Sequence, residues 1–287
     1  MKILICGASG FVGRHLTTSL REAGHNVIRA VRRPSEPEDI AADFRNDTDK
    51  TAWIPRLDGI DVVVNAVGVL RNNADNPMQK LHTETPLALF EACVETEVTR
   101  IVHLSALGVD SGLDVPYFTT RLKTEHALHE LPANIRTLCL RPSVIYGEDG
   151  ASARMFRQMA KLPLHALPMG GTQALQPVNI ADICAAVVRW LSAPDASSLT
   201  VEAVGAEATT MRGMLDSYRE QLGHRPAWHV ATPRLLVRLA SRIGDFIPSS
   251  PLCSDTYAML SAGNTASAEG FASLLGHQPR SYRTFIS

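Results

Sequence analysis

Three glycines stand three residues apart near the start of the chain, in the segment G-A-S-G-F-V-G at residues 7–13. An apolar run precedes this segment and helical apolar spacing follows it, so the glycines mark a strand that turns into a helix. Such a turn presents unpaired backbone N–H groups at a helix N-terminus, where they bind phosphate. A tight turn without a ligand is the alternative. The segment predicts contacts to a dinucleotide pyrophosphate from Gly7, Ser9, Gly10, Phe11, Val12 and Gly13.

Two adjacent arginines, Arg32 and Arg33, follow the second apolar run. In NAD sites an acidic side chain roughly 20 residues after the glycines binds the ribose 2′-hydroxyl, whereas guanidinium groups bind the 2′-phosphate of NADP. The first acids here, Glu36 and Glu38, come beyond Pro34. The sequence therefore predicts NADP(H) in preference to NAD(H), with Arg32 favoured because it is nearer the strand end. The alternative is that one or both arginines point into solvent.

The elements that must position these residues alternate, because short β-rich runs are separated by segments with helical spacing. This order is typical of parallel strands joined by crossover helices. Residues 62–64 form a continuous apolar run, which is typical of a sheet covered on both faces. The pattern predicts an α/β fold with a doubly wound parallel sheet. We expect strands at 2–7, 26–31, 61–67, 100–105 and 135–140, and helices at 86–95 and 118–130.

The alternation of strands and helices becomes irregular after Gly147, where turn-forming residues are frequent. The loop-rich stretch near 148–172 is expected to be an insertion. We expect a Rossmann domain over 1–205 and a small, substrate-facing C-terminal domain over 206–287. Apolar spacing predicts the elements that complete them, namely a strand and a helix within 174–191, a strand at 199–204, and helices at 211–222 and 232–245.

The charge balance argues against two classes of partner. The chain carries 28 basic and 29 acidic side chains, so its net charge of −1 gives no field that attracts nucleic acid or anionic lipid. No window approaches the roughly 18 consecutive apolar residues of a membrane span, and the N-terminus lacks the pattern of a signal peptide. We therefore expect a cytoplasmic protein with neither a nucleic-acid partner nor a membrane span.

Cysteines and histidines give no sign of a metal centre. The five cysteines lie far apart, mostly in apolar runs, as expected for buried thiols. His126 and His129 are three residues apart on a predicted helix, but no Cys, Asp or Glu completes zinc spacing around them. A solvated helix face explains them, and we expect no metal site.

Several longer segments resemble those of a known superfamily. They are G-A-S-G-F-V-G at 7–13, D-F at 43–44, N-A-V-G at 65–68, I-V-H-L-S-A-L-G at 101–108, R-P-S-V-I-Y-G at 141–147 and Q-P-V-N-I-A-D-I at 176–183. The chain is similar over residues 1–205 to the extended and atypical short-chain dehydrogenases/reductases. In particular it resembles the NAD(P)H-binding epimerase-like proteins that include the nucleotide-binding accessory subunit of respiratory complex I.

The resemblance implies further cofactor contacts. Asp43 and Phe44 are implied to hold the adenine, although a solvated loop is the alternative for the acid. Pro142, at the end of the fifth strand, is implied to lie beside the nicotinamide. Small residues at the end of the third strand are implied to let the backbone follow the adenosine and pyrophosphate, namely Ala66, Val67 and Gly68.

Active members of the superfamily use a Ser, a Tyr and a Lys, the last two spaced Y-x-x-x-K on one helix. Tyr117 occupies the tyrosine position here, but Arg121 stands where the lysine is expected. Lys123 lies about 240° from Tyr117 around an ideal helix, so it does not share that face. Arg121 could stabilise a tyrosinate and bind ribose hydroxyls, but it cannot relay a proton. Tyr117 could instead be a half-buried structural residue.

The expected serine is Ser105, which ends the fourth strand, or it is a mere strand-end hydroxyl. Two functions therefore remain open. The first is an NADP(H)-dependent oxidoreductase, or an epimerase with bound cofactor, acting on a small substrate such as a nucleotide sugar. The second is a non-catalytic NADP(H)-binding protein used for assembly or redox sensing, since the Tyr–Lys pair is altered. A homodimer and a subunit of a larger complex are both compatible with the resemblance.

Overall fold

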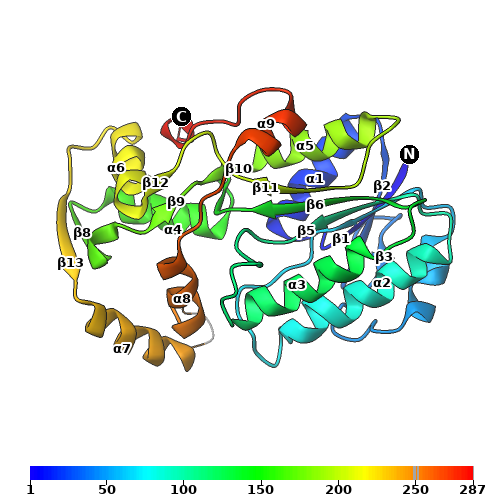
Figure 1. Cartoon of the computed structure of the whole chain (residues 1–287), viewed down its shortest axis with the longest axis horizontal. Helices are drawn as coiled ribbons and strands as arrows, with labels where there is room; N and C mark the ends of the chain where they lie inside the picture. The colour runs from blue at the N-terminus through cyan, green and yellow to red at the C-terminus, as the bar shows by residue number, and fades with distance from the viewer. Residues whose placement is uncertain (248–249, 251, 287) are drawn as a thin grey trace. The chain divides into compact units, whose positions relative to one another are not determined.

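The computed structural model describes residues 1–247, 250 and 252–286. Over these residues the largest sheet has seven strands in the order β11-β6-β5-β4-β1-β2-β3 (Figure 1). The strands from β6 to β3 pair in parallel, and β11 lies beside β6 at the edge. Their bounds are β1 Lys2–Cys6, β2 Asn26–Val31, β3 Ile40–Ala41, β4 Val62–Asn65, β5 Arg100–Leu104, β6 Arg136–Pro142 and β11 Leu199–Ala203.

Helices cover both faces of this sheet. Figure 1 shows α1 and α5 on one side and α2 and α3 on the other. Every residue of β4 is buried, as its continuous apolar run requires when both faces are covered. The arrangement confirms the predicted α/β fold with a doubly wound parallel sheet. The helices are α1 Phe11–Glu22, α2 Thr85–Val94, α3 Pro116–His129 and α5 Ile180–Ser192.

Four short elements of unit 1 have no counterpart among the expected ones. Strand β3 has two residues, too few to show an alternating pattern. A π-helical turn, η3 (Lys80–Glu84), precedes α2, and two 3-10 turns, η1 (Lys50–Ala52) and η2 (Ile54–Leu57), precede β4.

The chain divides into two compact units. Unit 1 comprises Met1–Arg141 and Cys184–Val201, and unit 2 comprises Pro142–Ile183 and Glu202–Ser287. The expected domain boundary near residue 205 stays a prediction, while the contacts group residues 142–183 with the C-terminal segment. The reason is strand pairing between distant segments, because β8 (Leu164–Pro168) pairs with β13 (Trp228–Thr232) and β9 (Ala174–Leu175) pairs with β12 (Thr209–Thr210).

Unit 2 has its own apolar core, in which the ring of Tyr146 stacks on Phe285 with centroids 4.8 Å apart and also contacts Tyr218. Its last helices follow β13 directly along the chain (Figure 1). Its remaining elements are β7 Ile145–Tyr146, α4 Ala151–Lys161, η4 Met169–Gly171, β10 Val178–Asn179, α6 Met211–Gln221, α7 Arg234–Asp245, α8 Ser254–Ala262, α9 Glu269–Leu275 and η5 Tyr282–Thr284.

The five cysteines are all buried and free of disulfides in the part of the chain that the structure describes. Burial raises the pKa of the Cys184 thiol to about 11, and it raises the pKa of Cys6 and Cys93 further still. Among the described residues, no helix has the length and apolar character that crossing a membrane would need.

Candidate functional site

The glycine turn is built so tightly that side chains would not fit. Gly7 has φ +78°, and a Cβ there would lie 3.0 Å from backbone atoms of Ala66 and Val67. A Cβ on Gly13 would overlap the carbonyl oxygen of Gly7, and the Gly10 N–H donates to that same oxygen at 2.9 Å. The glycines therefore let the end of β1 pass close to the end of β4 and let α1 begin directly against the turn.

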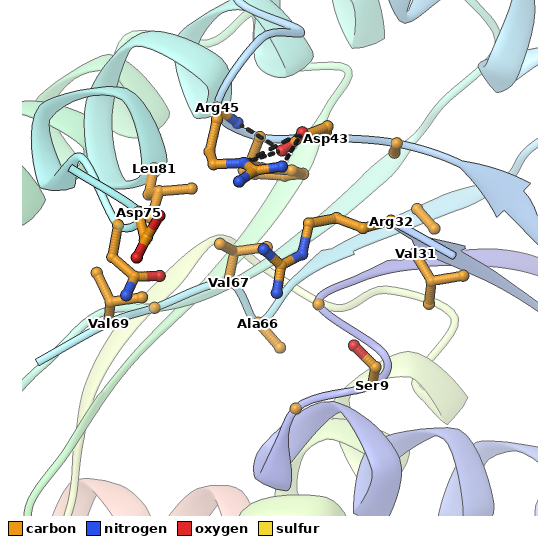
Figure 2. A pocket seen from close by; sticks show the side chains of 17 residues that line it. Ser9, Val31, Arg32, Asp43, Arg45, Ala66, Val67, Val69, Asp75 and Leu81 are labelled. Atoms are coloured by element: carbon orange, nitrogen blue, oxygen red, sulfur yellow. Dashed lines mark hydrogen bonds and ion pairs between the residues drawn. The ribbon is translucent and has the colours of Figure 1, made fainter. Parts of the chain in front are cut away.

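An open pocket lies at this end of the sheet, within unit 1. It is lined by residues that follow β1, β2, β3 and β4 (Figure 2). In a parallel sheet these carboxyl ends are where ligands bind. Nine of the predicted cofactor residues line it: Gly7, Ser9, Gly10, Arg32, Asp43, Phe44, Ala66, Val67 and Gly68.

The other predicted cofactor residues lie outside the lining of this pocket. Phe11, Val12 and Gly13 form the first turn of α1, so their contribution would be backbone N–H groups. Arg33 is exposed beyond the end of β2. Pro142, the last residue of β6, is half-buried.

Arg32 is an unpaired cation in the pocket. Figure 2 shows its side chain extending from the end of β2 towards Ala66 and Val67. Within the described residues Arg32 forms no ion pair; the two acids that line the pocket are Asp43, which is bound by Arg45, and Asp75. Its charge is therefore available to an anionic ligand.

The acids that follow Pro34 are bound elsewhere. Glu36 pairs with Arg21 at 2.6 Å and with Arg29 at 2.8 Å. Asp39 accepts two hydrogen bonds from Arg29, at 2.8 and 2.7 Å, and these hold the pKa of its carboxyl well below the usual range. Glu38 is exposed and does not line the pocket. Glu36, Glu38 and Asp39 therefore contribute no carboxylate to the pocket lining.

Arg45 is a second pocket arginine, and sequence reasoning missed it. Its Nε and Nη2 donate to the two oxygens of Asp43 at 2.9 and 2.6 Å, and this contact lowers the pKa of Asp43 (Figure 2). The spacing Asp43–Phe44–Arg45 could have indicated the contact, because an Asp side chain in a turn accepts the backbone N–H two residues on, as Asp43 does from Arg45 at 3.1 Å. The ring of Phe44 is buried against Trp53, with centroids 5.3 Å apart, so it anchors this loop to the core.

Arg121 is buried beside the end of β5. Its Nη1 donates to the carbonyl oxygens of Leu104 and Ser105 at 2.7 and 3.2 Å, while Nε has no partner in the described part of the chain. Its Cζ lies 4.8 Å from the centroid of the Tyr117 ring. A Cβ on Gly68 would overlap Nη2, so the absence of a side chain there admits the guanidinium. Arg121 thus joins the strand end, the tyrosine and the pocket wall.

The structure brings Tyr117 and Arg121 into contact and places the backbone of Ser105 on the same guanidinium. Tyr117 is half-buried, and its ring also meets His82 edge to face with centroids 5.8 Å apart. The Ser105 hydroxyl is buried and has no hydrogen-bond partner among the residues described. One arginine, one phenol and one unsatisfied hydroxyl therefore occur near the end of β5.

Two histidines beside Arg121 were not expected to take part in this site. His82 Nε2 accepts the Val69 N–H at 3.1 Å, which requires a neutral ring. Burial, with Arg121 adding to it, lowers the pKa of His82 to about 2 and that of His103 to about 3. Since histidines at strand ends and on helices are common, their separate positions in the sequence carried no signal of this cluster.

A further ion pair joins α3 to the end of β6. Arg141, at the end of β6, donates to Glu125 on α3, with Nη2 2.7 Å from Oε2, and also to Asp110 at 2.5 Å. Glu125 is completely buried, so this pair ties α3 to the sheet. The pair fixes the helix that carries Tyr117 and Arg121 relative to β6.

One group of three possible metal ligands lies in unit 2, away from the expected histidines. His165, Asp216 and His229 come together, with His229 Nε2 2.8 Å from Asp216 Oδ1. Arg212 approaches the other oxygen of Asp216 at 3.6 Å, and Arg219 is close enough to help lower the pKa of His165 after burial and His229. A cation here would lie beside two guanidinium groups, which disfavour it.

Comparison with known proteins places this site in a family. Residues 3–202 match the model of the NAD dependent epimerase/dehydratase family. A 3-diazoavenalumate denitrifying reductase from a Streptomyces species is 30% identical over 242 residues, covering 73% of this chain and 74% of that protein. The mitochondrial 40 kDa subunit of NADH-ubiquinone oxidoreductase from Neurospora crassa is 20% identical over 246 residues, covering 82% of this chain. The match spans 63% of that subunit's length.

Solved structures show the same fold. The NADPH-dependent quinone oxidoreductase of Escherichia coli, solved with NADPH, has a TM-score of 0.75 and 18% identity, covering 99% of this chain and 98% of that one. Other structures with this fold hold NAD. The fold, the glycine turn and the match over residues 3–202 agree with the expected resemblance to epimerase-like proteins and to complex I subunits. The chain therefore belongs to the NAD dependent epimerase/dehydratase family.

Proposed function

We propose that this chain binds NADP(H) in the pocket of unit 1. The observation that carries the proposal is Arg32, a cation in the pocket without an ion-pair partner in the described residues, while Glu36 and Asp39 are neutralised by Arg29. A 2′-phosphate would supply the missing anion. The glycine turn and the first N–H groups of α1 would hold the pyrophosphate.

A charge reversal at Arg32 tests this preference. We expect Arg32→Glu to lower the affinity for NADPH about tenfold or more, since hydrogen bonds to charged groups contribute about 1.5–3 kcal/mol. The affinity for NADH should stay within about twofold. Isothermal titration calorimetry with both nucleotides measures the ratio.

The matched control is Arg33→Glu, which changes the same charge on a residue outside the pocket lining. It should leave the ratio of the two affinities close to that of the wild type. An unchanged ratio in Arg32→Glu would contradict NADP(H) selection by this residue.

The reaction that fits the site is reduction or oxidation of a small carbonyl or sugar-nucleotide substrate. The bound nicotinamide supplies or accepts the hydride. Tyr117 gives its hydroxyl proton to the substrate oxygen, and the charge of Arg121, 4.8 Å from the ring, stabilises the phenolate that remains. Arg121 stays protonated, so the proton returns to Tyr117 from solvent or substrate. The unpartnered Ser105 hydroxyl orients the substrate oxygen.

Tyr117→Phe tests this role. We expect turnover of NADPH with a reactive substrate to fall about 100-fold or more, as for loss of a general acid, while affinity for NADPH changes little. A panel of carbonyl compounds and nucleotide sugars, followed by NADPH absorbance, identifies the substrate. Tyr257→Phe, on α8 of unit 2, is the control that should keep full activity. Equal activity of wild type and Tyr117→Phe would remove the tyrosine from the mechanism.

A non-catalytic, cofactor-binding role is the second candidate, and one observation favours it. Arg121 uses Nη1 on two backbone carbonyls, so this group holds the end of β5 in addition to facing Tyr117. In that case NADP(H) stabilises a fold used for assembly or redox sensing. Deuterium-labelled NADPH decides between the two candidates, because transfer of the label to any substrate excludes the non-catalytic role.

A further inference from the structure

Helix α7 of unit 2 and the two residues that follow it present large apolar side chains to solvent. Six of them are between 46% and 88% exposed, the most exposed being Phe246. We call this set the apolar arc: Leu235, Leu236, Leu239, Ile243, Phe246 and Ile247. Contiguous exposed apolar patches are rare in soluble proteins and mark contact with a partner or a membrane.

The apolar arc points away from the rest of unit 2. The positions that α7 buries are Val237, Ser241 and Gly244, and a Cβ on Gly244 would overlap the carbonyl oxygen of Leu252. At 100° per residue the centre of the arc lies roughly 150° around the helix from these buried positions. Helix α7 is thus fixed to its unit by small residues on one side and offers its apolar side outward.

Three arginines border the arc. Arg234, Arg238 and Arg242 are spaced four residues apart, so they form one row along the helix, and we call them the arginine row. All three are exposed, and none forms an ion pair within the described residues. The acid of α7, Asp245, accepts hydrogen bonds from the N–H and hydroxyl of Ser254. The net charge of −1 for the whole chain conceals this local cluster.

An apolar face bordered by arginines is the pattern of a helix that lies in a lipid headgroup region. Arginine stems extend along the apolar layer while the guanidinium groups reach phosphates. Strand β13 leads into α7 (Figure 1), and it also exposes an indole, because its Trp228 is 80% exposed. Indole rings favour the boundary between apolar and aqueous layers.

A second copy of the chain fits this face less well. A symmetric pair of α7 helices would bring the same arginine row into the contact twice. The arc contributes no acidic side chain to compensate it, since Asp245 is held by Ser254. Anionic lipid supplies both the apolar layer and the negative charge. We propose that α7 docks unit 2 on an anionic lipid surface, independently of the cofactor proposal.

Vesicle sedimentation of the full chain tests the proposal. Wild type should sediment with mixed phosphatidylcholine–phosphatidylglycerol vesicles and less with pure phosphatidylcholine, and its binding to the mixed vesicles should weaken as salt is added. Leu239→Glu should reduce binding to the mixed vesicles about tenfold or more. The double variant Arg238→Glu/Arg242→Glu should remove the preference for phosphatidylglycerol.

The control is Val94→Glu, an exposed apolar residue at the end of α2 in unit 1, which should bind vesicles like the wild type. Circular dichroism melting shows whether each variant is folded. Wild type that stays in the supernatant with mixed vesicles overturns the proposal, as does a folded Leu239→Glu variant that binds them normally. Concentration-dependent dimers in analytical ultracentrifugation that Leu239→Glu abolishes, without vesicle binding, would assign the arc to a second copy instead.

Discussion

Arg121 is a buried positive charge that forms no ion pair within the described residues. Its described contacts are two carbonyl oxygens and the face of Tyr117, and the nearby His82 and His103 are uncharged at neutral pH. A desolvated cation without a carboxylate favours the appearance of negative charge beside it. This explains how an arginine could support the phenolate of Tyr117 in place of the expected lysine.

The same two histidines make stability depend on pH. Their folded pKa values, about 2 and about 3, lie below the ordinary 6.5, so the unfolded chain binds more protons below pH 6.5. The stability that these two neutral histidines contribute is therefore fully present above about pH 6.5, and it is lost progressively as the pH falls below that value. The free energy of unfolding should fall by about 1.4 kcal/mol per pH unit for each histidine.

Urea unfolding at a series of pH values between neutrality and about pH 5 measures this slope. His82→Gln should reduce the slope by the contribution of one proton, whereas His277→Gln, an exposed control, should not change it. The same slope in His82→Gln and wild type would show that His82 is not held neutral by the fold.

At the residue scale, the sequence alone indicated the glycine turn and the Tyr117–Arg121 spacing, which the structure shows as a tight turn and a contact, while the roles of Arg32, Tyr117 and Arg121 stay predictions. It did not predict Arg45, His82 or the carbonyl contacts of Arg121. Those depend on contacts between residues far apart in the chain, such as Arg121 with Leu104, for which local spacing gives no signal. The assignment of Ser105 and Pro142 to the cofactor or substrate stays a prediction.

In the turn between β1 and α1, we expect one glycine to matter mainly for folding and another mainly for cofactor binding. Gly13 packs against the carbonyl of Gly7 and does not line the pocket, whereas Gly10 lines it. We expect Gly13→Ala to lower the free energy of unfolding by about 1–3 kcal/mol, as for overpacking of a core.

Gly10→Ala should cost less stability, because its Cβ would lie 3.2 Å from the Gly7 oxygen, yet it should weaken NADPH binding more. Chemical denaturation and calorimetry on both variants compare the two effects. If Gly13→Ala proved as stable as the wild type, the close packing of α1 on the turn would not matter for folding.

At the scale of elements, long apolar runs were predictable and short elements were not. The expected strands at 2–7, 26–31 and 100–105 agree with β1, β2 and β5 to within a residue or so at each end. Strand β3 has two residues and gains its hydrogen bonds from β2, so its conformation comes from pairing rather than from its own pattern. The same holds for β9 and β12 of unit 2.

At the scale of the whole molecule, each of the two units has its own apolar core. Tryptophan fluorescence reports on the core of unit 1. Trp53 and Trp190 are buried in unit 1, while Trp228 of unit 2 is already 80% exposed. Fluorescence should therefore follow the unfolding of unit 1. NADPH at about 100 times its dissociation constant should stabilise that transition by about 2.7 kcal/mol through mass action.

Thermal unfolding followed by fluorescence, with and without NADPH, measures the shift. Arg32→Glu should show a smaller shift with NADPH than the wild type does. No change in midpoint for the wild type with saturating NADPH would contradict a cofactor site in unit 1.

The order of domains along the chain could be read only in part, because residues 142–183 join unit 2 through strand partners more than 30 residues away, such as Leu164 with Trp228. Sequence spacing shows which segments form strands, but it does not show which of two distant segments will pair. The C-terminal helices were predicted at 211–222 and 232–245, close to α6 and α7. The sequence pattern alone did not show what contacts the apolar side of α7.

Because the cysteines are buried, their reaction with a thiol reagent reports whether the chain is folded. A maleimide or disulfide reagent requires a thiolate it can reach, and the native fold withholds both access and ionisation at Cys6, Cys93 and Cys184. Labelling therefore counts molecules that have opened. The time course of alkylation in dilute reagent becomes a direct clock for spontaneous opening of unit 1, without any denaturant.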